Sequence, residues 1–192
     1  MSTKALETRY AGHLFRSRLE ARWAAYFDLS GWTWTYEPID ADGYIPDFLI
    51  HGPAPMMVEV KPATCAAELD EHTSRVEAAL ADHWGGDILI LGVGPMLSKT
   101  WGGHTPSLGR LGQRVEPWAL EQAAGWIWDD GLATTCTEST CSKQAVVHAS
   151  SQFTSMPCGH YDGDHYMDTR TMPEIEGRWG KAHELTRWTG RR

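Results

Sequence analysis

The stretch that decides the fold is YIPDFLI (44–50), HGPAP (51–55) and MMVEVKP (56–62), which follow one another without interruption. The two outer segments are rich in β-branched, aromatic and other apolar residues that favour strands. The middle segment holds one glycine and two prolines, which is typical of a compact connection. The stretch therefore predicts two strands joined as a hairpin.

Pairing that is symmetric about the middle of this loop places two carboxylates opposite each other. Ile50 then faces Met56, and Asp47 faces Glu59, with the Cβ atoms of opposed residues roughly 4.5–5.5 Å apart. Two such carboxylates repel unless a positive charge lies between them, and hard divalent cations such as Mg²⁺ prefer oxygen ligands. Lys61 shares the face of Glu59, because strand side chains alternate. The hairpin thus predicts a metal-plus-lysine site for a phosphate, provided that the register holds, since a slip of one residue would turn Asp47 away.

The surrounding pattern predicts an α/β unit with a mixed sheet. Apolar residues at three- and four-residue steps indicate helices, and alternating or continuous apolar runs indicate strands. The expected order is helix, three strands, helix and strand: 14–29, 32–37, 44–50, 56–62, 65–83 and 87–94. On the first helix, Glu20 lies at the edge of the apolar stripe, from where it could approach the polar face of the sheet.

Beyond residue 95 the pattern is weaker. Residues 96–114 are rich in glycine and are expected to be irregular, with one short strand near Leu108. Helices are expected at 117–128 and 174–189. We therefore expect a core over residues 1–115 and a C-terminal appendage over residues 116–192.

The pattern resembles the PD-(D/E)XK nuclease superfamily, in particular its small phage-encoded and resolvase-like members. The resemblance lies in a helical Glu20, then Pro46-Asp47 and Glu59-Val60-Lys61, in that order, and covers residues 14–94. It implies a restriction-endonuclease-like core of one helix, three antiparallel strands, a second helix and a further strand. The motif is short, so its specificity comes from the element order, the hairpin length and the helical glutamate taken together.

The resemblance also implies hydrolysis of phosphodiester bonds in DNA with Mg²⁺ or Mn²⁺. Asp47, Glu59 and the Val60 carbonyl would bind the metal, which polarises a phosphoryl oxygen and lowers the pKa of a bound water. Lys61 would orient that water or stabilise the negative charge of the transition state. Glu20 would hold a metal-bound water. Arg16 and Arg18 would contact phosphate, and a homodimer would allow both strands to be cut.

Cysteine and histidine gather in the second half of the chain. Cys136 and Cys141 form one pair, and Cys158 and His160 form another, which together are a possible frame for a structural Zn²⁺ site. His148 and His165 are substitute ligands. Unrelated thiols and surface histidines remain the alternative interpretation, because Cys-x-His is an unusual spacing for zinc.

Composition narrows the functional class. The chain has 192 residues and a formal net charge of −8, which argues against indiscriminate, charge-driven binding to DNA but leaves a metal-dependent nuclease open. No apolar run approaches the ~20 residues that span a membrane, and the first residues lack a secretory apolar segment, so a cytoplasmic protein is expected.

Several other functions stay open at this point. The same fold could serve as a catalytically weak nucleic-acid-binding or protein-interaction module, although a pure binding module needs no lysine beside paired acids. A zinc-stabilised inhibitor or adaptor is a further class. His160, Asp162, Asp164 and His165 lack the ββα frame of an HNH nuclease, and Cys65 has no signature of a catalytic nucleophile.

Overall fold

The computed structural model describes residues 5–100, 103–115, 125–135, 144–148, 154–155 and 172–187. Within these residues, eight strands form one sheet in the order β10-β9-β8-β7-β6-β5-β4-β3. The pair β5–β6 is parallel and the other pairs are antiparallel, so the sheet is mixed. The elements in chain order are β1 (Thr8–Tyr10), β2 (His13–Phe15), α1 (Arg18–Leu29), β3 (Thr33–Tyr36), β4 (Phe48–His51), β5 (Met56–Val60), α2 (Ala66–Leu80), β6 (Asp87–Thr100), β7 (Gly103–Val115), β8 (Gly125–Thr135), β9 (Gln144–His148), β10 (Thr154–Ser155) and α4 (Met172–Leu185).

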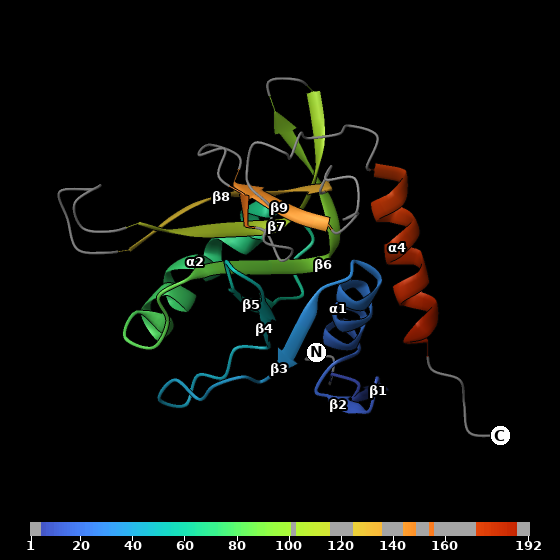
Figure 1. Cartoon of the computed structure of the whole chain (residues 1–192), viewed down its shortest axis with the longest axis horizontal. Helices are drawn as coiled ribbons and strands as arrows, with labels where there is room; N and C mark the ends of the chain where they lie inside the picture. Colours follow the sequence, from blue (N-terminus) through green and yellow to red (C-terminus); the bar gives the residue numbers. More distant parts are fainter. Residues whose placement is uncertain are drawn as a thin grey trace.

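Helices cover both faces of the sheet (Figure 1). Helices α1 and α4 lie side by side on one face, where their apolar side chains pack with Phe48, Val58 and Leu89. Helix α2 covers the other face and packs on Met57 and Ile88. The order of helix, three strands, helix and strand predicted for the first half is confirmed. None of the helices in the described part of the chain is long and apolar enough to cross a membrane.

The first helix begins later than expected. The prediction of a helix from residue 14 was wrong, because Leu14 and Phe15 belong to β2. Ser17 is the N-cap: its backbone is extended, and its hydroxyl accepts a hydrogen bond of 3.1 Å from the backbone N–H of Glu20. This cap satisfies one of the free N–H groups of the first turn and fixes the start of the helix at Arg18.

Replacing Ser17 with alanine is expected to lower the free energy of unfolding by about 1 kcal/mol, because the first turn of α1 loses its capping acceptor. Chemical denaturation of the full chain measures this change. Ser17→Asp keeps an oxygen acceptor at the N-cap and should restore most of the stability. Equal denaturation midpoints for wild type and Ser17→Ala would show that the cap contributes nothing.

The glycine-rich segment predicted to be irregular is a pair of long strands, β6 and β7, so that prediction was wrong. The glycines there allow close packing instead of marking a loop. A Cβ atom at Gly109 would lie 2.0 Å from the Ile90 carbonyl oxygen, and one at Gly112 would lie 2.8 Å from the Trp128 ring. Only glycine permits this approach between neighbouring strands.

Residues 125–128 lie in strand β8, so the prediction of a helix through them was wrong, and residues 116–124 lie outside the described residues. Side chains there alternate: Trp126 is buried and Ile127 is exposed, which is the period of a strand. Strand β8 pairs with β7 and continues the sheet. The division into a core and an appendage stays a prediction. The last predicted helix is observed as α4.

Candidate functional site

The predicted hairpin has the predicted register. Ile50 pairs with Met56 and Phe48 pairs with Val58, so Asp47, one residue before β4, continues the ladder opposite Glu59. Asp47 Oδ2 accepts a hydrogen bond of 2.7 Å from the backbone N–H of Val60, the neighbour of Glu59. Both carboxylates are buried, with 5% of Asp47 and 6% of Glu59 exposed. The two acids therefore meet where β4 begins and β5 ends.

The two faces of β5 carry apolar and charged side chains as the alternation predicts. Val58 is buried among the side chains beneath α1, and Val60 packs against the same cluster. Lys61 lies on the opposite face and forms an ion pair with Glu59 Oε1. Because burial removes water from the acids and the lysine, their charges interact more strongly than they would on a surface.

Burial, together with repulsion between carboxylates, acts on the pKa of Asp47. Burial and the neighbouring carboxylates of Glu59 and Glu20 raise the pKa of Asp47 to about 7. The hydrogen bond from the Val60 N–H and the positive charge of Arg16 lower the pKa, but they offset only part of this rise. The site thus holds more negative charge than its own cations neutralise, which favours a further cation.

Arg16 links the acids across the end of the sheet. Its side chain is half exposed and lies between the carboxylates of three residues: Asp47 at 2.8 Å, Glu37 at 2.9 Å and Glu20 at 4.0 Å. Its phosphate contact stays a prediction, and in the structure its ion pairs join these three acids.

Glu20 approaches Asp47 from α1, which lies on the face of the sheet opposite to Lys61. Its Oε2 accepts a hydrogen bond of 2.6 Å from the Tyr36 hydroxyl, which in turn accepts one of 3.1 Å from the backbone N–H of Arg16. Because Ser17 caps α1 directly before it, Glu20 stands in the first turn, close to the strand ends. The structure therefore brings Glu20, Asp47, Glu59 and Lys61 to one end of the sheet.

Tyr44 lies beside the pair of acids formed by Asp47 and Glu59. A tight turn with positive φ at Asp42 and Gly43 returns the chain, and Ala41 and Tyr44 exchange both backbone hydrogen bonds. Burial and the adjacent Glu59 carboxylate raise the pKa of Tyr44. In the described part of the chain, the Tyr44 hydroxyl and Glu59 Oε2 are buried without a hydrogen-bond partner of normal geometry.

These observations fit a divalent cation. The Glu59 carboxylate interacts with the Tyr44 hydroxyl, but its buried Oε2 makes no hydrogen bond of normal geometry, and the adjacent acid has a raised pKa. The N–H of Val60 faces Asp47, and the carbonyl of a strand residue points to the same side as its N–H, so the Val60 carbonyl also faces this side. Across the described residues, no three His, Cys, Asp or Glu side chains meet as a common metal site. A cation at this position would have two carboxylates and a backbone carbonyl as its protein donors.

Sequence reasoning overlooked Tyr36, Tyr44 and the ion-pairing role of Arg16. The i, i+4 spacing of Arg16 and Glu20 and the Ser17-x-x-Glu20 capping pattern were available signals for the helix start and its ion pair. The partners of the two tyrosines depend on long-range packing. The predicted zinc ligands Cys136, Cys141, Cys158 and His160 lie outside the described residues, as does His165; His148 ends strand β9, and its side chain is not described.

No family model, curated protein or solved structure matches this chain. The assignment of a function therefore depends on the geometry and chemistry of the site alone.

Proposed function

We propose that this protein is a divalent-metal-dependent nuclease of the PD-(D/E)XK type that hydrolyses phosphodiester bonds in DNA. The observation that carries the proposal is the pair of buried, opposed carboxylates, Asp47 and Glu59, with Lys61 bonded to one of them. The helix–three strands–helix–strand order around this pair supports a restriction-endonuclease-like core. The helical Glu20 beside the pair is the further feature expected of such a core.

Asp47, Glu59 and the Val60 carbonyl would hold Mg²⁺ or Mn²⁺. When bound, the metal would supply Lewis-acid polarisation of a phosphoryl oxygen and a water of lowered pKa. Asp47 must lose its proton to serve as a ligand, and Glu59 must release Lys61. Arg16 and Lys61 therefore neutralise part of the charge of Asp47 and Glu59, and a bound metal would take their place.

Lys61 has the central role among the protein groups. Once released by Glu59, its ammonium group would donate hydrogen bonds to a non-bridging phosphoryl oxygen and orient the attacking water. A donor held in a site shielded from water stabilises developing negative charge much more than a solvated one does. Glu20, held by Tyr36, would position Arg16 and accept a hydrogen bond from water at the site.

The proposal is tested by incubating the purified full chain with plasmid, duplex and single-stranded DNA in Mg²⁺, Mn²⁺ or EDTA. Cleavage is expected with either metal, and none with EDTA or with Asp47→Asn. Gel filtration with and without DNA reports whether the protein acts as a homodimer. Binding of DNA without cleavage in any metal would instead identify a nucleic-acid-binding module on the same fold, and equal cleavage by Asp47→Asn would refute the assignment.

A further inference from the structure

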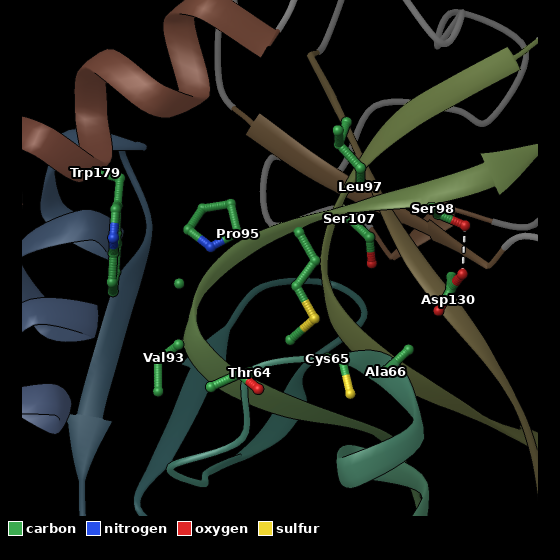
Figure 2. Close-up of a pocket in the computed structure, with 12 residues that line it drawn as sticks. Thr64, Cys65, Ala66, Val93, Pro95, Leu97, Ser98, Ser107, Asp130 and Trp179 are labelled. Atoms are coloured by element: carbon green, nitrogen blue, oxygen red, sulfur yellow. Dashed lines mark hydrogen bonds between the residues drawn. The ribbon is translucent and has the colours of Figure 1, made fainter.

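A pocket of about 440 Å³ is lined in part by Thr64 and Cys65, in the segment that joins β5 to α2. Its walls come from the start of α2, the second half of β6 and one residue each of β7, β8 and α4, and include Thr64, Cys65, Val93, Leu97, Ser98 and Trp179. Figure 2 shows the indole of Trp179 beside Pro95 on one side of the pocket, across from Ser98 and Asp130. Its volume is in the range of small-molecule sites, and its lining combines apolar walls with a few polar groups.

The segment that follows β5 and carries Lys61 continues into the wall of this pocket. Lys61 precedes Thr64 by three residues, so their Cα atoms are at most about 10–11 Å apart. Two backbone hydrogen bonds of 2.8 Å, from Lys61 N–H to the Leu91 carbonyl and from Val93 N–H to the Ala63 carbonyl, bind this segment to β6. The pocket therefore lies within one or two nucleotides of a phosphate held at Lys61.

Two arginines on α1 supply positive charge at the other side of Trp179. Arg22 places its guanidinium 5.4 Å from the centroid of the Trp179 ring. In the described residues, the Nε atoms of Arg18 and Arg22 are buried and have no hydrogen-bond partner. Burial and the positive charge of Arg18 lower the pKa of Arg22, so the two guanidinium groups repel each other, and among the described residues no carboxylate acts on the pKa of Arg22.

We propose that Arg18, Arg22 and the pocket lined by Trp179 form a subsite for one unpaired nucleotide of the substrate strand, next to the cleavage site. This inference rests on the proposed nuclease function and names its substrate class. The arginine pair takes a phosphate, because paired guanidinium groups match phosphate oxygens in charge and geometry. The apolar wall of Trp179, Pro95 and Leu97 takes the base. The hydroxyls of Thr64 and Ser98 donate to Glu68 and Asp130, so their oxygens are left to accept hydrogen bonds from N–H groups on the edge of the base.

The nucleotide must be unpaired because a base inside a duplex cannot enter a pocket without leaving its stack. A base that is already single-stranded avoids the unstacking cost, and stacking against aromatic side chains tolerates any base sequence. The subsite therefore favours overhangs, flaps, gaps or single strands over fully paired duplex. A stacked base contributes roughly 5- to 150-fold in affinity, which sets the size of the expected preference.

Cys65 offers a direct measure of occupancy that does not depend on cleavage. It is an exposed thiol that lines the pocket. In EDTA, N-ethylmaleimide labelling of Cys65 is followed by peptide mass spectrometry, which separates it from the other three cysteines. A duplex with a short single-stranded overhang, at about ten times its Kd, should slow labelling roughly ten-fold, because only free protein reacts. A blunt duplex of the same sequence should not protect Cys65.

Substitutions in the proposed subsite test whether its residues cause the protection of Cys65. Arg18→Gln, Arg22→Gln and Leu97→Glu should each reduce the preference for the overhang substrate roughly ten-fold, in binding and in cleavage rate. Leu185→Glu, at the last residue of α4, and Arg187→Gln, two residues after it, are the matched controls. Leu185 is 55% exposed, close to the 58% of Leu97, and both controls should behave as wild type.

The outcomes separate this inference from the proposed function. Equal protection of Cys65 by blunt and overhang DNA, or an unchanged preference in Leu97→Glu and Arg22→Gln, overturns the subsite even if the protein cleaves DNA. Selective protection that these variants abolish supports the subsite. If that protection occurs without cleavage in Mg²⁺ or Mn²⁺, the subsite stands and the nuclease assignment fails.

Discussion

Replacing Lys61 with alanine is expected to lower the rate of DNA cleavage by about 100- to 1,000-fold, the usual cost of removing one donor that stabilises transition-state charge. Metal binding should survive. Lys61 forms an ion pair with Glu59, so its removal leaves the Glu59 carboxylate available to a cation. Metal affinity in Lys61→Ala should therefore equal or exceed that of wild type, while turnover is lost. Calorimetric titration with Mn²⁺ and single-turnover cleavage measure the two quantities separately.

Lys181→Ala provides the matched control for this experiment, because it removes the same charge from an exposed position on α4. Its cleavage rate should be that of wild type. Loss of metal affinity in Lys61→Ala would show that the lysine organises the acids instead of acting on the substrate. Retention of full cleavage by Lys61→Ala would remove the lysine from the mechanism altogether.

The geometry of the acid pair could be predicted from the sequence because it depends on local rules. Strand side chains alternate with a period of two, and a short loop sets the register of a hairpin. Pairing of Ile50 with Met56 followed from the loop length alone, and it carried Asp47 to Glu59. The location of Glu20 required one further element, the helix that precedes the sheet.

The partners of these acids depend on contacts that no local rule supplies. Tyr36 bonds to Glu20 across sixteen positions, and Arg16 bonds to Asp47 across thirty-one. The prediction that the glycine-rich segment of β6 and β7 is irregular was wrong for a related reason. A glycine marks a loop or a close approach between strands, and only the neighbour, such as the Ile90 carbonyl beside Gly109, decides which.

The arrangement of cations around the acids has a consequence for metal binding. Asp47 is held by Arg16, and Glu59 is held by Lys61. A buried acid without a partner would destabilise the fold, so these ion pairs offset part of the cost of burying the two carboxylates. A bound metal would replace them, and part of its binding free energy would be used in separating the pairs. We therefore expect modest affinity for Mg²⁺ and tighter binding when substrate phosphate draws Arg16 and Lys61 away from the acids.

Metal affinity is also expected to rise about ten-fold for each unit of pH below about 7, where Asp47 must lose a proton before it can bind. The raised pKa in the folded state means that proton binding by Asp47 stabilises the metal-free fold fully below the pKa of the unfolded chain, about 4, and that this contribution disappears as pH rises through about 7.

Calorimetric titration with Mn²⁺ between about pH 5.5 and pH 8.5, in buffers of different ionisation enthalpy, measures both the affinity and the release of the proton. Below about pH 6, close to one proton should leave Asp47 for each metal bound, and above about pH 8 the release from this group should nearly vanish because Asp47 is already ionised. Asp82→Asn, which removes an exposed carboxylate after α2, should keep this profile, whereas Asp47→Asn should lose tight binding at every pH. An affinity that does not change between pH 5.5 and 7 would contradict a metal bound through Asp47, because no ligand with so high a pKa could then be exchanging its proton for the cation.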